Sequence, residues 1–176
     1  VSMLLIGVTE FFREPHVFAY LDCEVLPRLA ETGGEIRVWS AGCSDGAELY
    51  SVAMLLARRG LLERSVLVGT DCREEAISRA QQGWFDAARL ECLDPDLRRE
   101  FVVADGKGGR IGKRLRDAVR WRQGDVLAAP CDLESWDLIL CRNLAIYLEP
   151  SSIARLWERL AAALRLGGFL VVGKSE

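Results

Sequence analysis

Three short segments carry residue types suited to binding a ligand, and each directly follows a run of apolar residues. They are Gly42-Cys43-Ser44-Asp45-Gly46, Asp71 and Arg142-Asn143. Glycines in the first segment let the backbone approach a ligand closely, and the start of the helix that follows offers unpaired N–H groups. The carboxylate of Asp71 can accept hydrogen bonds from two hydroxyl groups, such as those of a ribose. This combination predicts a site for an adenosine-type ligand.

Other interpretations of these segments are open. The glycine spacing is neither the G-x-G-x-x-G of dinucleotide-binding proteins nor the G-K-[ST] ending of a P-loop. A nucleotide-dependent oxidoreductase is therefore supported by fold-level analogy alone. Asp71 has a structural alternative, because it can cap a helix that begins near Glu74. A fourth segment, Gly124-Asp125-Val126, precedes an expected helical stretch.

The cysteines and the charge limit the remaining functions. The six cysteines are Cys23, Cys43, Cys72, Cys92, Cys131 and Cys141. None forms a C-x-x-C pair or a metal-ligand cluster with the single His16, so we expect no metal and free thiols in a reducing cytoplasm. With 23 basic and 26 acidic residues, the net charge of -3 gives no general attraction for nucleic acid or anionic membrane. No apolar run reaches the roughly 20 residues of a membrane helix, so we expect no membrane insertion.

The elements that must position these residues alternate between strand and helix, and at 176 residues the chain fits one domain. Apolar runs predict strands at 36–41, 66–70, 137–141 and 169–172, and helical periodicity predicts helices after Gly46, from Glu74 to about Gln82, and from Pro150 to Gly167-Gly168. Near-continuous apolar strands between helices indicate a parallel sheet covered on both faces. We therefore predict a doubly wound α/β domain, in which ligands bind at the carboxyl ends of the strands.

One stretch, from about residue 85 to residue 123, interrupts this alternation. It contains a helical segment at 95–101 and a turn-rich segment at 105–109, with Val102-Val103 and Ile111 placed to form a hairpin. We expect an inserted subdomain rather than part of the main sheet. This stretch is also the most basic part of the chain, and its basic residues form either a solvated face or a docking surface for an acidic partner.

Six motifs, in order and over nearly the whole chain, make this sequence resemble the CheR family of chemotaxis receptor methyltransferases. They are Thr9-Glu10-Phe11-Phe12-Arg13, residues 38–44 with Tyr50-Ser51, Gly69-Thr70-Asp71, residues 137–143, Ile146-Tyr147-Leu148, and residues 166–169 with Gly173-Lys174-Ser175-Glu176. The resemblance implies a Rossmann-like, class I S-adenosylmethionine methyltransferase sheet with a small inserted β-subdomain. It implies a methyltransferase domain over residues 1–176, as a fragment of a longer protein.

The resemblance further implies methyl transfer from S-adenosylmethionine to glutamate side-chain carboxylates of a chemoreceptor or receptor-like protein, with S-adenosylhomocysteine as the product. Such a carboxylate is already ionised at neutral pH, so catalysis needs positioning more than a general base. By resemblance, the cofactor-binding residues are Thr9, Arg13, Ala41, Gly42, Cys43, Glu48, Asp71, Asp125, Val126, Arg142 and Asn143, with Asp71 on the ribose and Asp125 and Val126 beside the adenine. The catalytic residues are Arg13, Arg142 and Tyr147.

Two departures from the family pattern leave a second function open. The family's G-E-E-P-Y-S reads Gly46-Ala47-Glu48-Leu49-Tyr50-Ser51 here, so Ala47 replaces a glutamate that contributes to cofactor binding in relatives. The sequence also predicts fewer strands than such sheets usually have. The alternative is a weakly active or inactive signalling module that binds S-adenosylmethionine or a receptor. Arg13 and Tyr147 also have structural interpretations, as a surface residue and a core aromatic residue.

Overall fold

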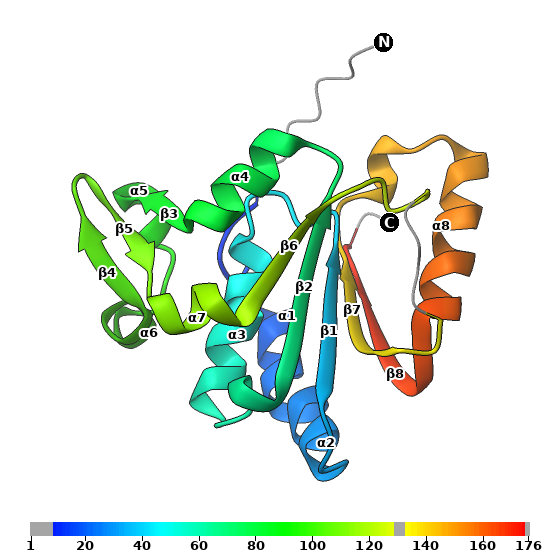
Figure 1. The fold of residues 1–176 in the computed structure, drawn as a ribbon, viewed down its shortest axis with the longest axis horizontal. Coiled ribbons are helices and arrows are strands. Elements are labelled where there is room, and N and C mark those ends of the chain that lie inside the picture. Colours follow the sequence, from blue (N-terminus) through cyan, green and yellow to red (C-terminus); the bar gives the residue numbers. More distant parts are fainter. Residues whose placement is uncertain (1–8, 129–132, 175–176) are drawn as a thin grey trace.

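Five parallel strands form the main sheet, in the order β6-β2-β1-β7-β8 (Figure 1). The computed structural model describes residues 9–128 and 133–174, so the expectations for residues 1–8, Cys131 and Ser175-Glu176 fall outside the described residues. The strands are β1 (Ile36–Ala41), β2 (Ser65–Asp71), β6 (Val119–Gln123), β7 (Trp136–Cys141) and β8 (Leu164–Val172). All four neighbouring pairs are parallel, which confirms the α/β fold.

The order of the strands reverses between β1 and β7. From β1 the chain moves outward to β2 and β6, and it then returns to the other side of β1 to form β7 and β8. Loops that leave β1 and β7 at their carboxyl ends therefore diverge in opposite directions. In open sheets of this kind the ligand site lies in the crevice at that reversal.

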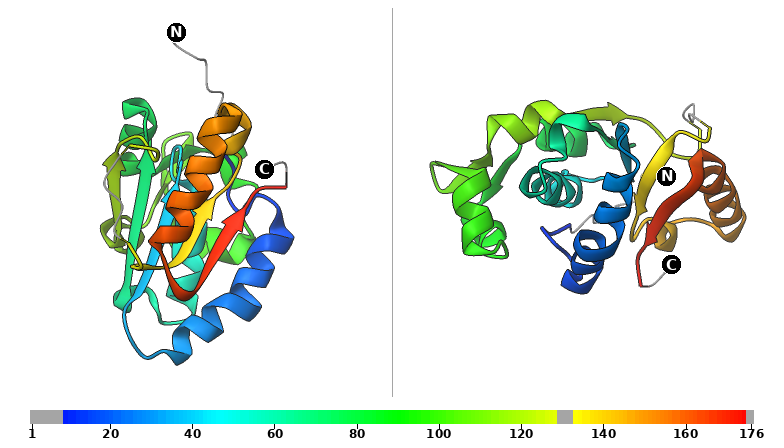
Figure 2. Two further views of the ribbon diagram at one scale, coloured as in Figure 1. Left: turned by 90° about the vertical axis from the view of Figure 1, so that its right-hand side faces the viewer. Right: turned by 90° about the horizontal axis from the view of Figure 1, so that it is seen from below.

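Helices cover both faces of this sheet (Figures 1 and 2). They include α1 (Pro15–Tyr20), α2 (Leu26–Glu31), α3 (Ala47–Arg58), α4 (Glu74–Gln82), α7 (Lys113–Ala118) and α8 (Pro150–Ala163), and a π-helical turn, Leu21–Val25, joins α1 to α2. Val38 and Leu138 face the core that contains α1, α2 and α3. Their neighbours Trp39 and Ile139 face the core that contains α8. Both sides of each central strand are therefore buried, which explains why these strands are continuously apolar in the sequence.

The end of α8 differs from the expectation. The helix stops at Ala163, and Gly167-Gly168 lies inside β8 rather than at the end of the helix. Backbone N–H groups of the segment before β7 donate to the carbonyls of Ala162 and Ala163, both at 2.9 Å. Because these bonds satisfy carbonyl groups at the end of the helix, the chain can turn into a strand directly at Leu164.

A second, antiparallel sheet stands beside the main sheet, in the order β3-β5-β4 (Figure 1). Its elements are β3 (Trp84–Asp86), α5 (Ala87–Leu90), α6 (Pro95–Phe101), β4 (Val102–Asp105) and β5 (Gly108–Ile111). The pairing of β4 with β5 confirms the predicted hairpin. The N–H of Ile111 donates to the carbonyl of Gly83 at 2.8 Å, so the two ends of this inserted part meet.

The last residues of the expected insertion belong instead to the main sheet. β6 pairs with β2 from Leu67 to Asp71 and is the outermost strand on that side. Within β6 only Val119 is fully buried and Trp121 is half-buried. An edge strand of this kind lacks the continuous apolar run that marked the other strands. The part that stands outside the main sheet therefore ends near Ile111, and α7 leads from it into β6.

Three basic residues of this region, Arg110, Lys113 and Arg114, have acidic partners. Arg110 lies 2.9 Å from Asp105, and Arg114 lies 2.5 Å from Glu63. Lys113 pairs with an aspartate one turn later on α7. For these three residues, the exposed pairs fit the interpretation of a solvated face. No helix in the described ranges is both long and apolar enough to cross a membrane.

Candidate functional site

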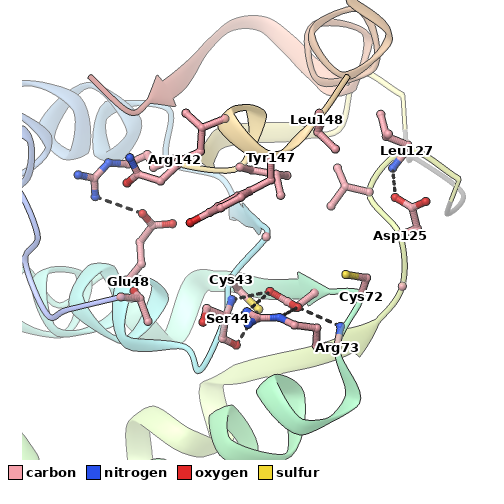
Figure 3. Close-up of a pocket in the computed structure, with 18 of the residues that line it drawn as sticks. Cys43, Ser44, Glu48, Cys72, Arg73, Asp125, Leu127, Arg142, Tyr147 and Leu148 are labelled. Carbon is pink, nitrogen blue, oxygen red and sulfur yellow. Dashed lines mark hydrogen bonds and ion pairs between the residues drawn. The ribbon is translucent and has the colours of Figure 1, made fainter. Parts of the chain in front are cut away.

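A pocket of about 530 Å³ opens at the carboxyl edge of the main sheet, where the strand order reverses (Figure 3). Its walls are the loops after β1, β2, β6 and β7 together with the segment that precedes α1. This volume lies in the range of about 300–1,000 Å³ that is typical of small-molecule sites. The pocket is therefore large enough for a nucleoside-sized ligand, at the place where the fold predicts one.

The loop after β1 owes its shape to backbone hydrogen bonds and to left-handed residues. The N–H groups of Gly42 and Cys43 both donate to the carbonyl of Thr70, at 2.8 and 2.9 Å, which ties this loop to the end of β2. Gly42 has φ +79°, and a Cβ at this position would lie 3.2 Å from the side chain of Leu144. Glycine is therefore favoured at position 42 both by the conformation and by the close approach of the loop after β7.

Asp71 ends β2 and faces the loop after β1. Its buried carboxylate accepts hydrogen bonds from the backbone N–H of Ser44 at 2.9 Å, and from the backbone N–H and Nε of Arg73 at 3.0 and 3.1 Å. The N-cap position of α4 is Arg73 rather than Asp71, although the Asp71 carboxylate accepts the backbone N–H of Arg73 at the start of that helix. The hydrogen bond with Asp71 also raises the pKa of Arg73. Both residues line the pocket.

Arg142, directly after β7, is buried between two carboxylates. Its side chain is 2% exposed, and its Nη2 and Nη1 atoms lie 2.6 Å from Glu14 and 3.2 Å from Glu48. Nη2 also donates to the carbonyl of Arg13 at 2.8 Å, and the guanidinium lies 5.5 Å from the ring centre of Phe18. The network joins β7, α3 and the segment before α1, so Arg142 holds one wall of the pocket together.

The segment before α1 passes along the pocket with unusual backbone angles. Phe12 (φ +51°) and Glu14 (φ +61°) are both left-handed, and they flank Arg13, which lines the pocket. The N–H of Phe12 donates to Ser51 Oγ at 3.0 Å. The hydrogen bond from Arg142 lowers the pKa of Glu14. Strained conformations persist where surrounding contacts fix them, and here the contacts fix the backbone on both sides of Arg13.

The residue that departs from the family pattern does not face the pocket. Ala47 is fully buried at the start of α3, whereas its neighbour Glu48 lines the pocket. Ser40 Oγ donates to one oxygen of Glu48 at 2.9 Å, and Arg142 holds the other. Glu48 therefore supplies a carboxylate at this wall although position 47 is an alanine.

The opposite wall is mainly apolar. Val126 and Leu127 line it from the loop after β6, and Tyr147 and Leu148 line it from the loop after β7. Asp125 accepts a hydrogen bond from the N–H of Leu127 at 2.8 Å, which shapes the first of these loops. The side chain of Tyr147 extends across the pocket toward the side of Glu48 (Figure 3). Aromatic and aliphatic side chains of this kind can pack against the flat face of a nucleobase.

Cys43 lines the pocket but is a poor nucleophile. Burial, together with the nearby charges of Asp71 and Glu48, raises the pKa of its thiol well above the ordinary value. The thiol is therefore protonated at neutral pH, and the thiolate is the reactive form. In the described part of the chain, no group of three or more His, Cys, Asp or Glu residues is placed to hold a metal ion. The side chains of this pocket are suited to binding and positioning by charge and by hydrogen bonds.

The structure brings most of the predicted site residues together in this one pocket. Those that line it are Thr9, Arg13, Gly42, Cys43, Glu48, Asp71, Asp125, Val126, Arg142, Asn143 and Tyr147. Ala41 is placed differently, because as the last residue of β1 it is buried in the core on the side of α8. The expected helix after Val126 is a turn over the residues that are described there.

Several lining residues were not among the predicted site residues, although Ser44 and Gly124 belong to segments that the sequence marks as candidates. These lining residues are Glu10, Ser44, Cys72, Arg73, Gly124, Leu127, Leu144, Ile146 and Leu148. All of them lie in sequence within a few positions of a predicted site residue. These residues could have been predicted by taking each loop as a whole, because each loop that leaves the carboxyl edge contributes several residues to the crevice.

Known proteins similar to this chain include chemotaxis methyltransferases. The chain matches the family model described as "CheR methyltransferase, SAM binding domain" over residues 7–176. It is 34% identical to a chemotaxis protein methyltransferase of Listeria innocua, with 100% of this chain and 67% of the relative covered. It is 33% identical to a probable chemotaxis protein methyltransferase of Rhizobium etli, with 100% and 69% covered. The chain thus spans about two thirds of the length of these relatives.

Solved structures with the same fold are also methyltransferases. The glycopeptide N-methyltransferase MtfA in complex with S-adenosylmethionine has a TM-score of 0.55 at 12% identity, with 94% of this chain and 50% of that chain covered. A TehB-like methyltransferase from Corynebacterium glutamicum has a TM-score of 0.50 at 15% identity, with 91% and 70% covered. At such identities the similarity concerns the fold alone, and it confirms the expected Rossmann-like methyltransferase sheet.

Proposed function

The chain belongs to the CheR methyltransferase family, and we propose that it transfers methyl groups from S-adenosylmethionine to glutamate side-chain carboxylates of a chemoreceptor or receptor-like signalling protein. The family binds S-adenosylmethionine, which identifies the cofactor. The relatives that act in chemotaxis support a receptor as the acceptor of the methyl group. The observation that carries the proposal is the pocket at the reversal of strand order, because it gathers residues of nearly every motif from distant parts of the chain.

The side chains of the pocket fit this cofactor. Asp71 offers a carboxylate for the ribose, and Val126 lies in the apolar wall that suits an adenine. Glu48 and Arg13 carry the opposite charges that an amino acid end requires. Each chemical part of S-adenosylmethionine therefore has a complementary group among the lining residues.

In this reaction the pocket residues position the reactants, and they do not have to activate a nucleophile. When bound, S-adenosylmethionine supplies a methyl group on a positively charged sulfur that leaves as a neutral thioether. The acceptor glutamate, with an ordinary pKa of about 4.3, is ionised at neutral pH and needs no base. Holding the acceptor oxygen in line with the methyl group provides the rate enhancement. The protonated Cys43 is consistent with this chemistry, since no protein nucleophile is required.

We assign two of the predicted catalytic residues to the acceptor, and the third to positioning of its neighbours. We assign Arg13 to the carboxylate of the acceptor or of the cofactor, because a guanidinium can hold a carboxylate in two hydrogen bonds. Tyr147 extends into the pocket and is assigned to its methyl-transfer side (Figure 3). Arg142 has its Nη atoms committed to Glu14, Glu48 and the Arg13 carbonyl, so we assign it as a positioning residue.

The proposed site of action is the cytoplasm. The five cysteines in the described part of the chain are free thiols, as is usual in a reducing compartment. Among the described helices, none has the length and apolar character needed to span a membrane. On this proposal the chain meets its receptor substrate through the receptor's cytoplasmic part.

The decisive experiment follows a radiolabelled methyl group from S-adenosylmethionine to a cytoplasmic chemoreceptor fragment. We expect label on the receptor that is released as methanol by mild alkali, because carboxyl esters hydrolyse in base whereas N-methyl groups do not. Asp71→Asn should weaken binding of S-adenosylhomocysteine by more than about tenfold in calorimetry and reduce labelling accordingly.

Two outcomes would redirect the proposal. Label that resists alkali would contradict a glutamate acceptor. Tight binding of S-adenosylhomocysteine without transfer to any receptor fragment would favour the alternative of an inactive signalling module. Arg59→Ala, which removes an exposed arginine paired with Asp22, is the matched control and should leave both binding and labelling unchanged.

A further inference from the structure

The carboxylate of Asp71 is already saturated with hydrogen bonds. Its Oδ1 accepts from the backbone N–H of Arg73 at 3.0 Å and from Arg73 Nε at 3.1 Å. Its Oδ2 accepts from the backbone N–H of Ser44 at 2.9 Å and from Arg73 Nη2 at 3.4 Å. A carboxylate has about four lone-pair positions, and these four donors occupy all of them. Ribose hydroxyls would therefore find no acceptor on Asp71 while the Arg73 side chain stays where it is.

Two of the four donors are backbone N–H groups, and the other two belong to one side chain. The N–H of Ser44 sits in the loop that is tied to Thr70, and the N–H of Arg73 sits at the start of α4. The other two donors belong to the guanidinium, which ends a flexible side chain. The Arg73 side chain is 26% exposed, whereas that of Asp71 is 7% exposed. Arg73 is therefore the more exposed side chain of the pair, and it borders the open pocket.

Arg73 also joins two walls of the pocket. Besides its contacts with Asp71, Nη2 donates to Ser44 Oγ at 3.1 Å. Figure 3 shows the side chain of Arg73 running alongside Ser44 and Cys43 at one side of the pocket. The same guanidinium thus neutralises the buried carboxylate and bridges the loops after β1 and β2.

We infer that Arg73 is a displaceable latch on the cofactor site, which the ribose must dislodge from Asp71 in order to bind. In the free protein the guanidinium satisfies the carboxylate and holds the two loops together. When the cofactor binds, the ribose hydroxyls take the places of Nε and Nη2, and the guanidinium moves into solvent. The latch stabilises the free protein by a contact that the complex lacks, so it weakens the measured affinity. This inference rests on the proposed function, because it requires Asp71 to receive the ribose.

The test is calorimetric titration of Arg73→Ala with S-adenosylhomocysteine. We expect the Kd to fall by about three- to tenfold, because one or two hydrogen bonds no longer have to be broken. A residue that contacted the ligand favourably would change the Kd in the opposite direction. S-adenosylhomocysteine is the probe because it lacks the sulfonium charge, so the loss of a nearby cation does not itself favour binding.

Two further variants keep the test interpretable. Arg73→Met retains the aliphatic part of the side chain, so it covers the case in which the alanine disturbs the start of α4. It should lower the Kd by about the same factor as expected for Arg73→Ala. Arg59→Ala is the matched control, since Arg59 pairs with Asp22 at 2.6 Å and is 33% exposed outside the pocket. Its Kd should equal that of the unmodified protein.

A double-mutant cycle with Asp71→Asn decides whether the effect passes through the carboxylate. Replacing Arg73 in that background should give no gain. The latch is overturned if Arg73→Ala and Arg73→Met both leave the Kd unchanged or raise it. It is also overturned if replacing Arg73 still lowers the Kd in the Asp71→Asn background. The proposed function survives these results as long as the unmodified protein binds S-adenosylhomocysteine and Asp71→Asn weakens that binding. If the unmodified protein does not bind it, the proposed function and the latch both fail.

Discussion

Among single residues, Arg142 carries most of the charge balance of the pocket. One guanidinium faces the carboxylates of both Glu14 and Glu48, and its side chain is 2% exposed. Its Nε is buried and has no hydrogen-bond partner among the described atoms. If the cation is removed, two neighbouring carboxylates, whose side chains are only 24% and 13% exposed, lose their counter-charge.

We expect Arg142→Met to lower the free energy of unfolding by about 3–5 kcal/mol, the usual cost of removing one partner of a buried ion pair. Urea unfolding measures this difference. The control, Arg59→Met, removes an arginine from an exposed pair and should cost no more than about 1 kcal/mol. If Arg142→Met costs no more than the control, Arg142 does not hold the wall together.

Glu14 gives the same network a dependence on pH. Its pKa lies below the ordinary value for a glutamate because Arg142 donates a hydrogen bond to the ionised form. The pair therefore stabilises the folded state above that ordinary pKa, and the contribution is lost as the pH falls through the lowered pKa. We expect Glu14→Gln to unfold more easily than the unmodified protein at pH 7, with the difference shrinking below about pH 4. Urea unfolding over this range tests the prediction, which a pH-independent difference would contradict.

Residue types and their positions after strands were enough to predict much of the pocket, but not the contacts inside it. Asp71 was predictable because it follows an apolar run that could only be a buried strand. The commitment of Arg142 to Glu14 was not, since the two residues are 128 positions apart and only the folded chain brings them together. The saturation of Asp71 by Arg73 was equally hidden, because the sequence does not reveal the direction of a side chain.

At the scale of elements, the place of β6 in the main sheet depends on two glycines. A Cβ at Gly69 in β2, or at Gly46 in the loop after β1, would lie 2.5 Å from the ring of Trp121. The Trp121 ring also packs edge-on against Tyr50 of α3, with the ring centres 5.3 Å apart. The indole thus fills space that these glycines leave open, and it anchors an otherwise polar edge strand.

We expect Gly69→Ala to lower the free energy of unfolding by about 1–3 kcal/mol, because the new methyl group overlaps the Trp121 ring. Denaturant unfolding gives the value. Gly34→Ala is the matched control, since a Cβ there meets nothing within 4 Å. Combining Gly69→Ala with Trp121→Leu should cost less than the sum of the two single changes, and strict additivity would rule out the overlap.

The sequence predicts the bounds of an element well where caps and prolines mark its ends. It does not predict them where contacts with distant segments set those ends. α6 spans the expected residues because Asp94 caps it and Pro95 occupies its first turn. β6 was not recognised, since an edge strand that pairs on one side need not be apolar. The end of α8 was misplaced because bonds from a different segment, before β7, terminate the helix.

Across the whole molecule, one arginine connects the inserted subdomain to the pocket. Arg89 on α5 donates to the carbonyl of Thr9 at 2.6 Å and forms an ion pair with Asp45 in the loop after β1. Its guanidinium lies 4.8 Å from the ring centre of Phe85, which belongs to the main core. The subdomain therefore holds the segment that carries Thr9 against the loop after β1.

We expect Arg89→Ala to raise the Kd for S-adenosylhomocysteine by about three- to tenfold, because the Thr9 segment loses its attachment to the loop. Calorimetry provides the measurement. The control is Arg110→Ala, since Arg110 pairs with Asp105 inside the subdomain and away from the pocket. Equal Kd values for the two variants would mean that the subdomain does not support the site.

The pairing of Arg142 with Glu14 has a consequence for how the protein is made. A ribosome releases Glu14 and Glu48 early and Arg142 much later, because Arg142 lies 128 positions after Glu14. Until β7 emerges, both acids lack the cation that holds them, and the segment before α1 lacks its contacts with Arg142. A nascent chain halted before β7 would thus carry three of the six motifs and no finished pocket, so cofactor binding has to wait until β7 has left the ribosome.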